Sequence, residues 1–235
     1  MKKILSIIVP TFNEQSTVGQ VFERIMEVDI PLKKQLVFID DCSTDGTAEV
    51  LSSLKETHPS IIIVTHETNC GKGAAIRSGL KKCDGDIVLI QDADLEYDPG
   101  LYPELLAPIL EDRADVVFGS RFIGSAPHRV LYFWHYFGNR ALTLLSNIFS
   151  NLNLTDMEVG YKIFRREVLE GVKLNENRFG FEPEITAKIA KKYVRIYEVG
   201  IPYYGRSYDE GKKITWKDGV VALYAIVRYN LFTKS

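Results

Sequence analysis

The sequence DIVLIQDAD at residues 86–94 places a short apolar run directly before two aspartates, Asp92 and Asp94. An unbroken apolar run of this length predicts a strand buried on both faces, as in a parallel sheet that helices cover. Four similar runs lie elsewhere in the chain, at residues 4–10, 35–40, 60–65 and 115–119. Because helical patterns separate them, the sequence predicts an α/β fold with a Rossmann-like, open, mostly parallel sheet and helices on both faces.

Helices are predicted where apolar residues recur at intervals of three and four. In the first half, one helix follows Ser16, its expected N-cap, and others occupy residues 44–55, 71–81 and 99–110. Beyond residue 120 the pattern predicts a C-terminal helical elaboration, with helices at 130–150, 166–172, 181–192 and 216–232 and a strand at 194–199. Because neither a linker nor a repeat divides the chain, we expect a single domain over residues 1–235.

The composition is that of an ordinary folded protein, since 46% of the 235 residues are hydrophobic and 26% are charged. Collagen-like, disordered and disulfide-scaffold proteins are thereby excluded. The net charge of −2 argues against a nucleic-acid partner, which needs clustered lysine and arginine. The charge is uneven, because residues 1–161 carry −8 and residues 162–235 carry +6. The acidic part suits a cation, and the basic part suits a phosphate or an anionic membrane surface.

The cysteines and the apolar segments bear on the cellular compartment. Cys42, Cys70 and Cys83 have no Cys-x-x-Cys spacing, so we expect reduced, buried thiols in a cytoplasmic protein. The run at 4–10 is too short for a signal peptide, and no stretch of about 18 apolar residues is present to span a bilayer. The chain is therefore expected to be soluble or to lie on a membrane. The four histidines lack the spacing of zinc ligands.

Polar residues gather after the predicted strands, where open α/β sheets bind their ligands. Asp92 and Asp94 are two carboxylates one residue apart that bind Mg²⁺ or Mn²⁺ together with diphosphate oxygens, or are solvated acids of a turn. Asp40 and Asp41 end another strand, where an acid contacts a ribose hydroxyl or a base N–H, or caps the next turn. Residues 71–73, Gly-Lys-Gly, begin a helix and favour an anion, or form a plain turn.

Five motifs in a fixed order give the chain its resemblance to a known family. They are SIIVPTFNE at residues 6–14, IDDCSTDGT at 39–47, NCGKG at 69–73, DAD at 92–94 and GSR at 119–121. Together they resemble the family-2 glycosyltransferases of the GT-A fold. Three later segments are similar to the acceptor side of the dolichyl-phosphate mannose synthase and dolichyl-phosphate glucosyltransferase branch, namely DMEVGYK at 156–162, FRR at 164–166 and PYYGR at 202–206.

The resemblance implies a metal-dependent, inverting glycosyltransferase that moves a hexose from a UDP- or GDP-sugar to a polyprenyl (dolichyl or undecaprenyl) phosphate. Residues 1–122 would form the nucleotide-sugar-binding half and residues 123–235 the acceptor-binding half. The alternatives are a hydroxyl of a glycan or glycolipid as acceptor or, more distantly, a sugar-nucleotide nucleotidyltransferase, whose glycine-rich loop is absent at residues 11–14. The implied location is the cytoplasmic face of the membrane, as a peripheral protein of cell-envelope glycan biosynthesis.

The resemblance also implies roles for individual residues. Asp92 and Asp94 match the D-x-D motif that binds Mg²⁺ or Mn²⁺ and the donor diphosphate. Donor binding is implied for Pro10, Thr11, Glu14, Asp41, Lys72, Asp92 and Ala93. Cationic residues around the lipid phosphate and the diphosphate are matched by Arg121, Arg140 and Arg206. The expected catalytic residues are Asp94, Arg121, Asp156 and Arg206.

The chemistry of the acceptor decides whether the enzyme needs a base. A polyprenyl phosphate is already anionic, so arginines would replace a base. A hydroxyl must lose its proton to a carboxylate, for which Asp156 is the candidate, with Glu158 behind it. Two departures from the mannose synthase pattern leave the sugar and the membrane attachment open. Glu96 stands where that group often has Gln, and no transmembrane pair precedes Ser235.

Three further segments each have more than one interpretation. The aromatic run at 131–137 suits an interfacial helix that gives a lipid-borne acceptor access to the site, or it belongs to the core. The charged stretch at 209–213 is a lid near the donor entrance or a solvated loop. Glu182 and Glu184 are expected to interact with the N-terminal dipole of their helix rather than to take part in catalysis.

Overall fold

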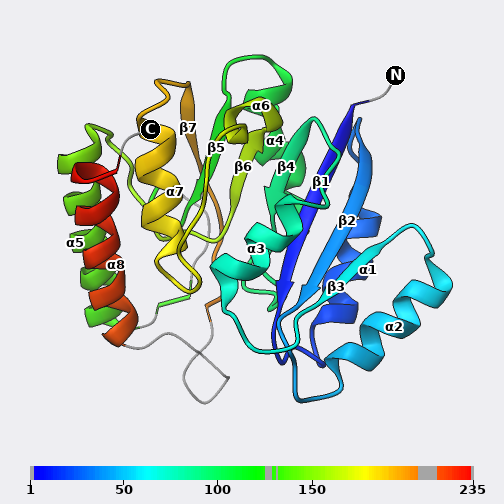
Figure 1. Ribbon diagram of the computed structural model, residues 1–235. Helices are drawn as coiled ribbons and strands as arrows, with labels where there is room; N and C mark the ends of the chain where they lie inside the picture. The colour runs from blue at the N-terminus through cyan, green and yellow to red at the C-terminus, as the bar shows by residue number, and fades with distance from the viewer. Residues whose placement is uncertain (1–2, 125–128, 131, 206–215, 234–235) are drawn as a thin grey trace.

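A computed structural model describes residues 3–124, 129–130, 132–205 and 216–233, and these form one seven-stranded sheet with flanking helices (Figure 1). The strands are β1 (Ile4–Thr11), β2 (Lys33–Asp40), β3 (Ile62–Thr65), β4 (Ile87–Ile90), β5 (Val116–Ser120), β6 (Lys162–Arg165) and β7 (Ile196–Gly200). They lie in the order β3-β2-β1-β4-β6-β5-β7. The expected α/β architecture is confirmed, and each predicted strand is present within a few residues of its expected bounds.

β6 is a strand that the sequence analysis missed, and it makes the sheet mixed. It pairs antiparallel with both β4 and β5, whereas the other strand pairs are parallel. The strand is only four residues long and has charged ends, so a search for apolar runs passes over it. Its Lys162 is nevertheless fully buried, because the ammonium group donates to the carbonyl oxygens of Met157 (3.0 Å) and Val159 (2.5 Å).

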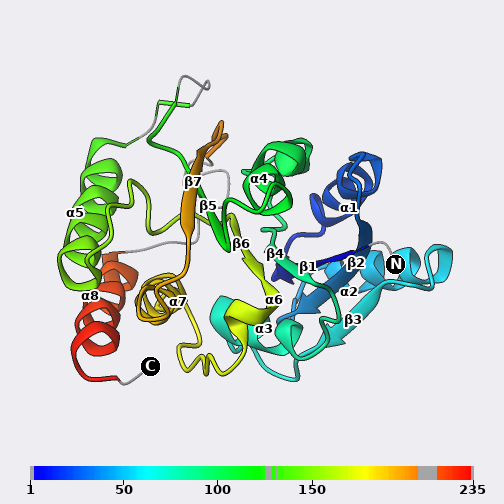
Figure 2. The same ribbon diagram turned by 90° about the horizontal axis from the view of Figure 1, so that it is seen from above.

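Helices cover both faces of the sheet (Figure 2). They are α1 (Val18–Glu27), α2 (Thr47–Thr57), α3 (Lys72–Leu80), α4 (Tyr102–Leu110), α5 (Phe133–Ser150), α6 (Arg166–Leu169), α7 (Phe181–Ala190) and α8 (Trp216–Leu231). α1 and α4 lie on one face, and α3, α6 and α7 lie on the other. α5 and α8 pack side by side beyond α7, at the end of the sheet farthest from β3. The expected C-terminal helical elaboration is therefore present.

One expectation about a helix start was wrong, and a second is refined by the structure. Ser16 is not the N-cap of α1, because the cap position belongs to Thr17, whose hydroxyl donates to the Glu14 carboxylate (2.9 Å) and accepts no hydrogen bond from the helix backbone. The helix predicted at 99–110 begins as a 3₁₀ turn, Pro99–Leu101, before α4. The carboxylate of Asp98 caps this 3₁₀ turn by accepting the N–H of Gly100 (3.1 Å).

The core follows from the two-residue period of the strands. In β1, the side chains of Leu5, Ile7 and Val9 join the large cluster on the α1 side, while Ile8 packs with Ala75 of α3 on the opposite face. Every one of these side chains is fully buried. The apolar run of β1 thus contributes side chains to hydrophobic clusters on both faces of the sheet.

The three cysteines are free thiols, but their burial differs from the expectation. Cys83 is buried beside the α3 face of the sheet. Cys42 and Cys70 are only half-buried, because each lies in a loop beyond the end of a strand. The expectation of three buried thiols is therefore wrong for these two.

The close packing of α3 on the sheet yields a stability prediction. A Cβ added at Gly79 would lie 2.6 Å from Cγ2 of Ile8 and 2.8 Å from Cδ1 of Ile39. Gly79→Ala should therefore lower the free energy of unfolding by about 1–3 kcal/mol, the usual cost of overpacking. The matched control is Gly138→Ala inside α5, where nothing lies within 4 Å of the new methyl group.

The control should be neutral or should stabilise by up to about 1 kcal/mol, through helix propensity. Urea unfolding monitored by circular dichroism measures both variants. Equal effects at the two glycines would contradict the packing argument.

Candidate active site

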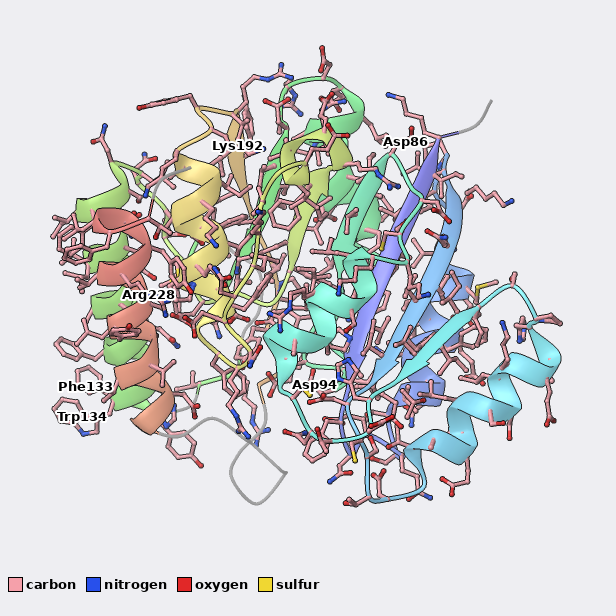
Figure 3. The ribbon with its side chains drawn as sticks, in the orientation of Figure 1. Asp86, Asp94, Phe133, Trp134, Lys192 and Arg228 are labelled. Carbon is pink, nitrogen blue, oxygen red and sulfur yellow. The ribbon has the colours of Figure 1, made fainter. Side chains whose placement is uncertain are left out.

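A cavity of about 810 Å³ opens at the carboxyl ends of the strands. Figure 3 shows Asp94 at this lower edge of the sheet, beside α3. The cavity brings together most of the residues predicted to form the site, namely Pro10, Thr11, Glu14, Asp41, Lys72, Asp92, Ala93, Asp94 and Arg121. They come from the end of β1, from the loops after β1, β2, β4 and β5 and from the start of α3. The edge of the sheet therefore assembles them as expected.

Lys72 forms ion pairs with two acidic residues of the cavity, Asp92 and Glu182. It begins α3, and its Nζ lies 2.9 Å from Oδ1 of Asp92 and 3.2 Å from Oε1 of Glu182. Burial alone would lower the pKa of Lys72, but the charges of Asp92 and Glu182 outweigh it and hold that pKa above its ordinary value. One ammonium group is thus shared by the half-buried carboxylate of Asp92 and the buried carboxylate of Glu182, and the trio keeps a net charge of −1 when all three groups are ionised.

The backbone around the D-x-D motif is closely fitted. Gly160 approaches Asp92 so closely that a Cβ there would overlap the carboxylate, and its N–H donates to the hydroxyl of Tyr97 (3.1 Å). Asp94 accepts a hydrogen bond from the backbone N–H of Glu96 (3.2 Å). Asp92 and Asp94 therefore present carboxylate oxygens, the donor type that Mg²⁺ and Mn²⁺ prefer, to one cavity. A divalent cation would compete with Lys72 for Asp92. Because Lys72 would keep Glu182 as a partner, the two aspartates fit such a cation.

Arg121 lines the cavity and is held by Asp156. Its Nε and Nη2 donate to the two carboxylate oxygens of Asp156 at 2.6 and 2.8 Å, and its backbone N–H donates at 3.1 Å. Burial would lower the pKa of Arg121, but the Asp156 charge raises it well above its ordinary value. Asp156 is fully buried and does not line the cavity. Its carboxylate is thus placed to position Arg121 rather than to meet an acceptor.

Asp41 organises the loop before α3. Its carboxylate accepts the N–H groups of Cys70 (2.9 Å) and Gly71 (2.6 Å) and lies 2.7 Å from Nδ1 of His66. The turn that follows β2 is closed instead by Asp40, which accepts the N–H of Ser43 (3.0 Å). Sequence analysis left Asp41 either as a nucleoside contact or as a cap of the following turn. In the structure Asp41 lines the cavity, and its carboxylate caps the loop before α3 rather than the turn that follows β2.

Sequence reasoning missed the grouping of Asp41, His66 and Cys70, whose ligand-type atoms lie within 4.8 Å of one another. The three residues come from different loops, so no motif spacing reveals them. Both ring nitrogens of His66 already have partners, Asp41 at 2.7 Å and Ser78 at 2.9 Å. This geometry fixes the imidazole as a link between the β2 end and α3.

Two glutamates that line the cavity, Glu182 and Glu158, were expected from the sequence to have other roles. Glu182 lies in the first turn of α7, as expected, but it is buried and faces Lys72 in the cavity, so a helix-dipole role alone is an incomplete description. Glu158 also lines the cavity. Burial, followed by the charge of Glu182, raises the pKa of Glu158 to about 8. Glu184 instead accepts the backbone N–H groups of Asn175 (2.8 Å) and Glu176 (2.8 Å).

The remaining predicted residues are less central or lie elsewhere. Arg140 does not line the cavity, and its guanidinium lies 6.0 Å from the ring centre of Phe122. Arg206 and the stretch at 209–213 lie outside the described residues. Glu96 lines the cavity and accepts a hydrogen bond from the Tyr203 hydroxyl (2.9 Å).

α5 joins the cavity to an exposed aromatic surface. Its residues Trp134, Gly138 and Leu142 line the cavity. At its start, Phe133 is 65% exposed and Trp134 is 76% exposed, and Figure 3 shows both at the outer end of α5. The interpretation of this run as core is therefore wrong for these residues. None of the described helices combines the length and apolar character needed to cross a bilayer.

Comparison with known sequences gives a family match. The sequence model of the family described as Glycosyl transferase family 2 matches residues 6–172. The Dolichol-phosphate mannosyltransferase of Pyrococcus furiosus is 29% identical over 216 residues, covering 89% of this chain and 60% of that protein. The Undecaprenyl-phosphate mannosyltransferase of Micrococcus luteus is 29% identical over 226 residues, covering 89% and 87%. The chain thus spans less than two thirds of the length of the first of these relatives.

Comparison with solved structures confirms the fold. Glucosyl-3-phosphoglycerate synthase from Mycobacterium tuberculosis, in complex with Mn²⁺, UDP and glucosyl-3-phosphoglycerate, matches with a TM-score of 0.75 at 20% identity, covering 99% of this chain and 82% of that chain. The complex of that enzyme with Mg²⁺ and UDP matches with a TM-score of 0.74. At this identity the likeness establishes the GT-A fold that the motifs predicted.

The buried position of Glu158 predicts a pH dependence of stability. With a pKa of about 8 in the folded state and an ordinary pKa when unfolded, Glu158 is protonated in the folded chain and ionised in the unfolded chain over the intervening pH range. The unfolded state then binds fewer protons, so this group makes stability fall as the pH rises toward 8. Its contribution has a slope of at most about 1.4 kcal/mol per pH unit.

Glu158→Gln should remove this contribution. The unfolding free energy of the variant minus that of the wild type should therefore become more positive from pH 5 to pH 8. Urea unfolding at several pH values measures it. Glu170→Gln, at an exposed position, is the control and should track the wild type. A pH-independent difference for Glu158→Gln would contradict the prediction.

Proposed function

Because this chain belongs to glycosyltransferase family 2, we propose that it transfers a hexose from a UDP- or GDP-linked sugar to a polyprenyl phosphate. The observation that carries the proposal is the convergence of Asp92, Asp94, Lys72 and Arg121 on one cavity at the carboxyl edge of the sheet. The polyprenyl-phosphate mannosyltransferases among its relatives support the acceptor class. The UDP complex of its structural neighbour supports the donor class.

The two ends of the cavity suit the two parts of such a donor. Pro10, Thr11, Glu14 and Asp41 line the side formed by β1 and β2, where we assign the nucleoside. The diphosphate is assigned to the side of Asp92 and Asp94. A divalent cation bound by these two aspartates would supply positive charge that stabilises the departing diphosphate. Lys72, released from Asp92, keeps Glu182 as its partner and stays within the same cavity.

The described residues favour an anionic acceptor over a hydroxyl. The carboxylate of Asp156 is saturated by Arg121, so the residue first considered as a general base is not placed to remove a proton. The same ion pair fixes a guanidinium in the cavity, where it can bind a phosphate. An acceptor phosphate needs no deprotonation to attack C1 of the hexose. The attack forms a bond from the acceptor oxygen to C1 as the bond from C1 to the diphosphate oxygen breaks, with inversion at C1.

The function is tested by incubating the protein with Mn²⁺, radiolabelled UDP- or GDP-hexoses and undecaprenyl or dolichyl phosphate in detergent. Labelled lipid should form, and Asp92→Asn or Asp94→Asn should lower its rate at least about 100-fold, as removal of a key electrostatic contact does. Asp98→Asn, an exposed aspartate outside the cavity, is the matched control and should retain the rate. Label in a glycan hydroxyl product, or release of pyrophosphate without transfer, would refute the proposal.

We further propose that the outer face of α5 and α8 rests on the membrane that carries the acceptor. Large apolar side chains are exposed along both helices, namely Phe133, Trp134, Phe137, Leu144 and Ile148 on α5 and Val220, Leu223, Tyr224 and Leu231 on α8. Aromatic and aliphatic side chains on paired helices suit the interfacial layer of a bilayer. Because α5 also lines the cavity, a lipid phosphate arriving at this face would be close to Arg121.

Membrane docking is tested by co-sedimentation with liposomes that contain anionic lipid. The intact protein should bind, and Trp134→Ser should weaken binding at least about tenfold, because the loss of one inserted aromatic removes roughly 1.5–3 kcal/mol. Tyr193→Ser is the control, since Tyr193 is 95% exposed and follows Lys192, which Figure 3 shows near the upper edge of the molecule, whereas Phe133 and Trp134 lie at the lower left. Absence of binding by the intact protein, or equal losses in both variants, would dispose of this docking surface.

A further inference from the structure

The cavity contains two carboxylate oxygens that have no partner. Among the described residues, Ser146 Oγ, Glu158 Oε1 and Glu182 Oε2 are buried side-chain atoms without a hydrogen bond. Two of these three atoms belong to carboxylates of the same cavity. Buried polar groups are nearly always hydrogen-bonded in folded proteins, so unpaired acceptors in a ligand cavity mark the place of a ligand donor. Ser146, on α5, does not line the cavity.

The position of these oxygens is fixed relative to the D-x-D motif. Glu182 shares the ammonium group of Lys72 with Asp92, so its carboxylate flanks the assigned diphosphate site. Glu158 precedes Gly160 by two residues, and Gly160 is pressed against Asp92. Glu158 and Glu182 both line the same cavity. Both glutamates therefore lie beside the point at which a donor diphosphate would end and its sugar begin.

The chemistry of the pair selects the class of group that it binds. The carboxylate of Glu182 accepts hydrogen bonds and repels phosphate oxygens, and the unpaired Oε1 of Glu158 is an acceptor oxygen even when that group is protonated, so this pair is not suited to the diphosphate or an acceptor phosphate. The neighbouring Lys72 already neutralises Glu182, and Lys162 is buried close by, which disfavours a second divalent cation. Neutral O–H donors remain. A hexose attached to the diphosphate carries several of them.

We propose that Glu158 and Glu182 form the subsite for the transferred hexose, with their unpaired oxygens accepting hydrogen bonds from its hydroxyl groups. This inference rests on the proposed function, because it takes the ligand to be a nucleoside-diphosphate hexose. It makes the two glutamates determinants of sugar specificity. A sugar that lacks a matching hydroxyl leaves a buried acceptor unpaired, and sites built in this way reject such analogues strongly.

The test separates sugar recognition from nucleotide recognition. Isothermal titration calorimetry with Mn²⁺ gives the dissociation constants of UDP and GDP and of their glucose and mannose derivatives for wild type, Glu158→Gln and Glu182→Gln. For the preferred nucleotide, each substitution should weaken binding of the sugar derivative at least tenfold more than binding of the plain nucleotide. Glu184→Gln is the matched control, because Glu184 is buried in the same helix but faces residues 175–176 and lies outside the cavity.

Deoxy-hexose donors provide a second measurement that requires no variant. At least one deoxy donor should bind the wild type at least tenfold more weakly than its parent, and this penalty should shrink to less than threefold in Glu158→Gln or Glu182→Gln. An unchanged ratio of sugar-nucleotide to nucleotide binding in both folded variants would overturn the hexose subsite. So would a second Mn²⁺ site that titrates in the wild type and disappears in the variants. Failure of the wild type to bind any sugar nucleotide would instead refute the proposed function.

Discussion

The contact on which the site depends is the double ion pair of Lys72 with Asp92 and Glu182. It joins three elements that are distant in sequence: the loop after β4, the first residue of α3 and the first turn of α7. Breaking one partner of a buried charge network leaves an uncompensated charge, so each member requires the others. The nucleotide-side sheet and the C-terminal helices are therefore coupled at the centre of the cavity, and neither half presents a complete site alone.

The parts of this arrangement that the sequence predicted are those governed by local rules. Strand runs, the order of the first four helices and the assembly of Asp92, Asp94, Asp41 and Lys72 at one edge follow from periodicity and from the geometry of parallel sheets. The specific roles of these residues in binding and catalysis stay predictions. The resemblance to a family added the expectation of the GT-A fold and of glycosyl transfer as the reaction.

The parts that were missed depend on tertiary contacts. Lys162 is buried in β6 because two backbone carbonyls accept its ammonium group, and Glu182 enters the cavity because Lys72 reaches it across the sheet edge. Neither fact has a signature in spacing or hydropathy, since lysine and glutamate at helix and strand ends are ordinarily solvated.

The charges that line the cavity support the proposal that a nucleoside diphosphate would bind here together with a divalent cation. Among the described lining residues, eight are acidic, and only Lys72, Arg121 and Arg178 carry a fixed positive charge. Lys72 and Arg121 are already paired with buried carboxylates, so little free positive charge is left for a diphosphate. A divalent cation on Asp92 and Asp94 would convert the most negative part of the cavity into an anion site. The sugar, being neutral, meets the remaining carboxylates without electrostatic penalty, so one acidic cavity can bind both parts of the donor.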